Sequence, residues 1–193
     1  MSIFLNHPSD WIGIPYFDKG DRWERPEDWA RELIEEIVVG QNLPRRKRVS
    51  QEQRDIVENI FVMLAKSVEE REASSSYLRL SDWYGPLILV DLRVESRYSA
   101  GTISIEDYAG ASDPDAIDPP LVEPFVTTSG LVGVRGTRHV VPDPAVPGII
   151  ATVEYAWEVD ETLVRLRTAT YDLIEFEQTL PYVDALAETV YSQ

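Results

Sequence analysis

The sequence predicts an α+β fold in which a mainly antiparallel sheet of about six strands carries two N-terminal helices and a C-terminal helix packed on it. Apolar residues recur at the helical spacing of about 3.6 residues before residue 73, and then at the strand spacing of about two residues over most of the chain that follows. Helical spacing returns near the C-terminus. We therefore expect a single α+β domain made of an N-terminal arm (1–24), a helical pair (25–73) and a sheet with its closing helix (77–193).

The N-terminal arm carries large aromatic side chains, including Trp11 and Tyr16, between prolines. Such side chains need burial, so we expect the arm to lie in order across the core. A helix is expected from Pro26 to Gly40, because proline is favoured at the first helical position, acids in the first turn and glycine at the end. Its apolar stripe consists of Trp29, Leu33, Ile34 and Ile37.

The second helix is expected to begin after Ser50 and to run to about Arg71. Ser50 and Gln53 have the spacing of a capping box, in which each residue's side chain bonds the other's backbone amide. A basic run, residues 45–48, lies between the two helices. It is interpreted either as a solvated loop or as a docking site for an acidic partner.

Six segments with strand patterns follow the helical pair. They cover residues 77–80, 87–95, 101–105, 131–141, 149–157 and 162–170. Residues 107–123 are rich in Asp, Pro, Ala and Gly and are expected to form a long loop. A closing helix is expected after Asp172, either as two segments divided at Pro181 or as one helix that begins near Pro181.

The chain is strongly acidic, with 34 Asp and Glu against 18 Lys and Arg and a formal net charge of −16. From Tyr77 onward there are seven arginines, no lysine and nineteen carboxylates. This charge repels nucleic acid and anionic membranes and attracts basic proteins, so we expect a basic protein partner. The chain has no cysteine, which excludes disulfides and thiolate chemistry. Its first residues do not resemble a secretory signal, which favours a cytoplasmic location.

Five residues are candidates for binding. Trp83 and Tyr84 are aromatic interface candidates, with core packing as the alternative for each. Arg135, Arg138 and His139 could together bind a phosphate or carboxylate, or the two arginines could form ion pairs on an acidic sheet. No hydrolase, Walker or zinc-protease motif is present, so neither catalytic residues nor a cofactor are expected.

Carboxylates also cluster along the chain. Asp113, Asp115 and Asp118 could ligate calcium, but the EF-hand spacing is missing and a solvated turn fits the adjacent prolines better, so no metal site is expected. Carboxylates four residues apart on a strand, such as Glu154 and Glu158, are interpreted as solvated surface.

The order of a strand at 149–157, a tight turn, a strand at 162–170 and a closing helix through residues 181–186 resembles the Mog1/PsbP-like α+β sandwich group. The resemblance covers roughly the last two-thirds of the chain and rests on element order. Members of that group are typically non-catalytic adaptors, assembly factors, or small-molecule and lipid-binding proteins. The resemblance therefore implies a non-catalytic role.

The sequence thus favours a non-catalytic interaction or adaptor protein whose acidic surface binds a basic partner, as immunity proteins or secretion adaptors do. The alternative is a small-molecule or lipid-binding protein with an apolar pocket between the sheet and the closing helix. An enzyme that uses His139 or a carboxylate pair is the third hypothesis.

Overall fold

The computed structural model describes residues 2–40, 49–68, 70–80, 86–141 and 148–193. Its centre is a seven-stranded antiparallel sheet with the strand order β2-β3-β4-β8-β7-β6-β5. The strands are β2 (Trp11–Gly13), β3 (Ser75–Leu80), β4 (Leu87–Ser96), β5 (Leu121–Val126), β6 (Val132–Val140), β7 (Ile150–Val159) and β8 (Thr162–Thr170). The α+β class and the antiparallel sheet predicted from the sequence are thereby confirmed.

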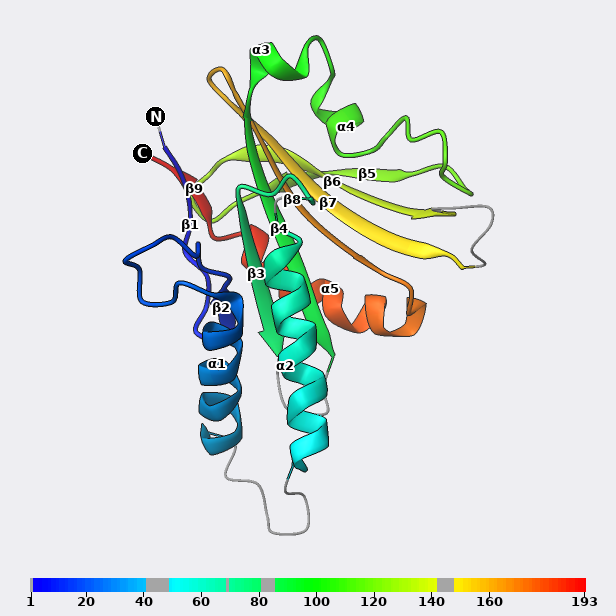
Figure 1. The fold of residues 1–193 in the computed structure, drawn as a ribbon. Coiled ribbons are helices and arrows are strands. Elements are labelled where there is room, and N and C mark those ends of the chain that lie inside the picture. Colours follow the sequence, from blue (N-terminus) through cyan, green and yellow to red (C-terminus); the bar gives the residue numbers. More distant parts are fainter. Residues whose placement is uncertain (1, 41–48, 69, 81–85, 142–147) are drawn as a thin grey trace.

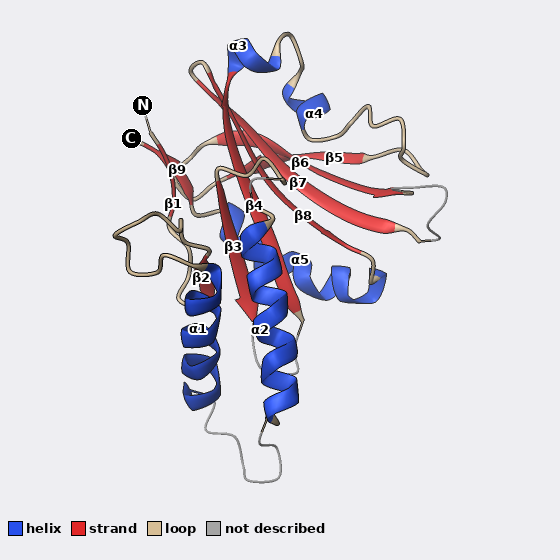
Figure 2. Ribbon diagram, in the orientation of Figure 1, coloured by secondary structure: helices blue, strands red, loops and turns tan. Residues whose placement is uncertain are grey.

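Helices cover both faces of this sheet, as Figure 2 shows. On one face, α1 and α2 lie beside β3 and β4, and α5 lies against the opposite face (Figure 1). Two short helices, α3 and α4, lie at the upper end of the sheet in that view. The bounds are α1 (Pro26–Gly40), α2 (Gln51–Lys66), α3 (Arg97–Ala100), α4 (Ile105–Tyr108) and α5 (Leu173–Ala187).

The helical pair buries the leucine-rich face of β3 and β4. Trp29 of α1 and Phe61 of α2 are buried against Leu78, with Leu89 packed beside them. Leu78 and Leu89 are directly opposite each other in the register, so they face the same side of the sheet. Side chains that alternate between the two faces of β3 and β4 therefore form the apolar surface on which α1 and α2 pack.

The opposite face of the same strands belongs to the main core. Val90 of β4 and Leu166 of β8 are fully buried against Phe176, Val183 and Leu186 of α5. Successive residues of β4 thus contribute to two cores in turn. This arrangement makes β4 a central strand that is covered on both faces over its first half.

A second cover lies on the α1–α2 side of the sheet, over β8, β7 and β6. Tyr108 and Ala109, at the end of α4, are buried against Ala156 of β7 and Leu163 of β8. Because α1–α2 cover β2 to β4 and α4 covers β6 to β8, this face of the sheet has two separate covers. The strip of sheet between these two covers carries charged side chains, and we call it the charged strip. Its residues include Arg93, Glu95, Glu154, Arg165 and Arg167.

The two ends of the chain pair with each other in a small separate sheet. Strand β1 (Ile3–Leu5) runs antiparallel to β9 (Val190–Ser192). Trp11 in β2 is buried in the core, and β2 pairs with β3 at the edge of the main sheet. Neither β1 nor β9 was predicted, because three residues are too few to show a strand period.

For the middle of the chain, one prediction is wrong and a second is correct only for residues 109–120. The expected strand at 101–105 is a turn that leads into α4, because the Ser104 side chain accepts from the Asp107 amide and caps that helix. The expected loop at 107–123 ends in β5, which contains Pro124. Strand β5 lies at the edge of the sheet, where a proline is tolerated because one side of the strand needs no ladder bond.

Helices α5 and α2 also differ from expectation. Helix α5 is continuous from Leu173 to Ala187 although it contains Pro181, whose exposed position and exposed i−4 neighbour Glu177 leave the freed carbonyl to water. Helix α2 ends at Lys66, earlier than predicted. There the Arg71 guanidinium donates to the Leu64 carbonyl oxygen at 3.1 Å, which satisfies a carbonyl that the helix end leaves open.

The basic run at 45–48 and the aromatic candidates Trp83 and Tyr84 lie outside the described residues. Within the described ranges, none of the helices combines the length and hydropathy that crossing a lipid bilayer takes.

Replacing Gly136 by alanine is expected to destabilise the protein by about 1–3 kcal/mol. A Cβ at this position of β6 would lie 2.1 Å from the Ala109 carbonyl oxygen, so the backbone after α4 would have to move. Gly13→Ala in β2 is the control, because the nearest atom to its added carbon, in the Tyr77 ring, is 4.0 Å away. Urea unfolding compares the two variants, and equal free energies of unfolding would contradict this close approach.

Candidate functional site

A buried glutamate lies at the centre of the charged strip. Glu154, in the middle of β7, is 1% exposed. Its Oε1 is 3.0 Å from Nη2 of Arg138 on β6 and 3.1 Å from Nε of Arg167 on β8. Nη1 of Arg165, also on β8, is 3.9 Å from Oε2. One carboxylate therefore lies within 4.0 Å of three guanidinium groups that approach from both neighbouring strands.

The register of the sheet brings these four side chains together. Glu154 is directly opposite Arg167 on one side and Gly136 on the other. Arg165 and Arg138 are each displaced by two residues on their strands, so they reach Glu154 diagonally. Because Gly136 has no side chain, the Ala109 carbonyl approaches β6 closely at the position opposite Glu154.

Arg138 extends the network to the segment after α4. Its Nε donates to Asp113 Oδ2 at 2.6 Å, and its Nη1 donates to the Ala109 carbonyl at 3.3 Å. Burial alone would lower the pKa of Arg138, but Glu154 and Asp113 raise it above its ordinary value. Burial alone would raise the pKa of Asp113, but the Asp115 amide and the Arg138 guanidinium lower it.

A cavity of about 330 Å³ lies beside this network, lined among others by Tyr108, Asp113, Arg165 and Glu154. Among the described residues, Oε2 of Glu154 has no hydrogen-bond partner. The Tyr108 hydroxyl donates to Glu95 across the upper part of the strip. Burial, together with this hydrogen bond, raises the pKa of Tyr108 above its ordinary value, so the phenol stays neutral.

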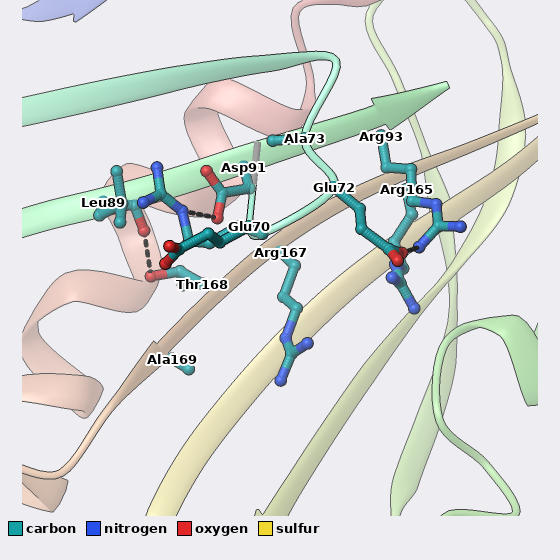
Figure 3. Close-up of a pocket in the computed structure, with 11 residues that line it drawn as sticks. Glu70, Glu72, Ala73, Leu89, Asp91, Arg93, Arg165, Arg167, Thr168 and Ala169 are labelled. Carbon is teal, nitrogen blue, oxygen red and sulfur yellow. Dashed lines mark hydrogen bonds and ion pairs between the residues drawn. The ribbon is translucent and has the colours of Figure 1, made fainter. Parts of the chain in front are cut away.

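A larger cavity of about 480 Å³ opens on the other side of Arg165 (Figure 3). We call it the β8 groove. One wall is the segment after α2 and the other is the surface of β4 and β8; the lining is Glu70, Arg71, Glu72, Ala73, Leu89, Asp91, Arg93, Arg165, Arg167, Thr168 and Ala169. Two internal ion pairs lie in it, Arg71 with Asp91 at 2.8 Å and Arg93 with Glu72.

The structure does not bring the predicted cationic cluster together. Arg138 faces Glu154, whereas Arg135 and His139 lie on the α5 side of the sheet, as their odd spacing from Arg138 requires. Arg135 is 3.2 Å from Asp184 and 3.5 Å from Glu123. His139 is 3.6 Å from Asp118. Both arginines therefore form ion pairs within the chain.

Of the large aromatic side chains of the arm, Trp11 is buried in the core and Tyr16 is exposed. The aspartates of the 113–118 loop do not converge, because Asp113 binds Arg138 and Asp118 faces His139. Within the described residues, no group of three His, Asp or Glu side chains is arranged to hold a metal ion.

The interpretation of Glu154 as solvated surface is wrong. Glu158, four residues further along β7, is exposed as expected. The signal that separates them is cross-strand, because Glu154 meets arginines on β6 and β8 that lie up to 16 residues away in the sequence. Arg165 and Arg167, which alternate on β8, were the available hint of a charged face.

No protein-family model matches the chain, and no curated protein is similar to it in sequence. Solved structures similar in fold include LpqN, involved in cell envelope biogenesis of Mycobacterium tuberculosis, at 9% identity and a TM-score of 0.42, covering 98% of this chain and 82% of that chain. Cyanobacterial PsbP (CyanoP) from Synechocystis sp. PCC 6803 is similar at 11% identity and a TM-score of 0.41, covering 100% and 92%. The second of these structures is a PsbP protein, and PsbP is one of the two names of the group that the sequence resembles.

The stability of the protein is expected to depend on pH through Asp113. Since the folded state lowers its pKa below the ordinary 3.8, its contribution is complete above pH 3.8 and is lost as the pH falls through the folded value. Asp113→Asn should therefore cost about 1–2 kcal/mol at neutral pH, and this deficit should shrink in acid. Urea unfolding from about pH 7 down to about pH 2.5 measures both curves.

Asp115→Asn is the matched control, because the Asp115 side chain is exposed and its backbone amide, which survives the substitution, is what bonds Asp113. It should follow the wild-type curve at every pH. An Asp113→Asn deficit that stays constant across the series would contradict the ionic role of Asp113.

Proposed function

We propose that this chain is a non-catalytic interaction protein whose acidic surface binds a basic protein partner. The observation that carries the proposal is the pairing of the arginines. Each of the seven arginines after Tyr77 lies within 4.0 Å of a carboxylate of the same chain: Arg79, Arg93, Arg97, Arg135, Arg138, Arg165 and Arg167. Since these cations are engaged internally, the surplus carboxylates at the surface lack compensation and attract positive charge.

The outward face of α5 is the part of this surface that best suits a protein partner. Helix α5 contains no lysine or arginine, and the exposed acids Glu177 and Glu188, the latter at the C-cap of the helix, share one face with the exposed Ile174. Ile174 is 76% exposed. An exposed apolar side chain flanked by carboxylates matches a partner that presents basic residues around an apolar contact.

Small-molecule binding is the second candidate function, and a different observation favours it. The β8 groove has a volume of about 480 Å³, within the range of small-ligand sites. The cavity found between the sheet and α5, where an apolar pocket was expected, holds only about 80 Å³ beside Phe176 and Thr179. If the chain binds a small molecule, the polar groove is therefore the better site.

Removing charge from α5 is expected to weaken partner binding more than removing the same charge elsewhere. The test variant is Glu177→Gln/Glu188→Gln, and the matched control is Glu35→Gln/Glu36→Gln on the exposed side of α1. Each pair removes two carboxylates. Immobilised wild type and both variants are incubated with native lysate at low salt and eluted with a salt gradient.

A basic protein that wild type and the α1 variant retain, and that the α5 variant releases at clearly lower salt, is the expected result. Equal elution from all three proteins would contradict docking on α5. Retention that does not respond to salt would contradict the electrostatic proposal as a whole.

A further inference from the structure

The β8 groove contains two arginines whose hydrogen-bonding capacity is largely unused. Arg165 donates no hydrogen bond to any described residue, and its nearest carboxylate oxygen is 3.9 Å away. The side chain of Arg167 is 46% exposed, and its ion pair with Glu154 uses one nitrogen. A guanidinium group has five N–H donors, so most donors of this pair are available to a ligand.

We propose that the β8 groove binds the oxyanion group, carboxylate or phosphate, of a small molecule through Arg165 and Arg167. The inference rests on the second candidate function and specifies its ligand chemistry. A guanidinium binds either oxyanion through two parallel N–H donors, which makes arginine the side chain suited to this recognition. Both side chains line the 480 Å³ cavity, and Figure 3 shows them on the β8 side of it.

The sheet geometry holds the two guanidinium groups on one surface. Arg165 and Arg167 are two residues apart on β8, so both point to the same face. Arg93 on β4 is directly opposite Arg165, which concentrates positive charge at this place in an acidic protein. Like charges directly across two strands repel each other, so an anion in the groove would relieve a repulsion that is built into the register.

The neighbouring carboxylates do not fully neutralise this pair. Arg93 has carboxylate partners of its own, Glu72 and Glu95. Arg165 and Arg167 share Glu154, and that carboxylate is also engaged by Arg138. The β8 arginines are thus the cations in the groove with the smallest share of negative charge.

The opposite wall of the groove limits what else the ligand can carry. Glu70 and Glu72 lie on the segment after α2 and face the cavity from that side. A second anionic group on the ligand would approach these carboxylates and be repelled. Leu89, Ala73 and Ala169 add apolar surface to the lining. The groove therefore suits a molecule with one oxyanion group and a neutral or apolar remainder.

The proposal is tested by titrating the full chain with small probes at constant ionic strength. Binding is monitored through the chemical shifts of the backbone amides. The probes are inorganic phosphate and acetate as the two oxyanions, methyl acetate as a neutral analogue, and chloride as the ionic control. We expect saturable shifts of β8 and 70–73 amides with phosphate, acetate or both, and their relative affinities identify the preferred oxyanion. Arg165→Gln and Arg167→Gln should each weaken binding at least about tenfold, because each removes one guanidinium.

Arg25→Gln is the matched control, since it removes the same charge from an exposed arginine immediately before α1. It should bind as wild type does. Thermal unfolding confirms that each variant is folded, and the half-exposed Arg167 keeps the test valid should Arg165→Gln unfold.

Three outcomes would overturn the proposal in distinguishable ways. Shifts with methyl acetate but not with the oxyanions would mean that the groove binds small molecules without anion recognition. No response to any probe beyond that to chloride would remove both the oxyanion site and the support for small-molecule binding. Oxyanion shifts that persist unchanged in Arg165→Gln and Arg167→Gln would place the anion elsewhere.

Discussion

The buried carboxylate of Glu154 is the interaction on which the arrangement of this protein depends. Removing a carboxylate from water is costly unless opposite charge and hydrogen bonds replace the lost hydration. Here the replacement comes from Arg138 and Arg167 on the two flanking strands, with Arg165 further away. Arg138 in turn binds Asp113 and the Ala109 carbonyl, so the segment after α4 is tied to the centre of the sheet through the same carboxylate.

This pairing also separates the charges of the molecule. The arginines of the sheet form ion pairs with carboxylates of the same chain. Because the chain has a net charge of −16, carboxylates remain in excess at the surface. The two proposed binding surfaces are therefore two results of one arrangement. The outward face of α5 is acidic and would attract cations, whereas Arg165 and Arg167 leave unused donors in the β8 groove on the other face of the sheet.

The parts of the fold that could be predicted from the sequence are those with local signals. Helix α2 begins where the capping box of Ser50 and Gln53 places it, and both bonds of that box are present. The edge strand β5 was missed because Pro124 interrupts its pattern, and its position at the sheet edge is a tertiary property. The candidate site was missed for a similar reason, because the burial of Glu154 depends on the register of β6, β7 and β8, which no single strand encodes.

A double-mutant cycle between Glu154 and Arg138 tests the central role of this carboxylate most directly. Free energies of unfolding are measured for Glu154→Gln, Arg138→Gln and the double variant, beside a second cycle on the more exposed pair Glu158 and Arg97, whose charged atoms are 3.4 Å apart. We expect a coupling energy of about 2 kcal/mol for the buried pair and less than about 0.5 kcal/mol for the more exposed pair. Additive effects of Glu154→Gln and Arg138→Gln would contradict the account.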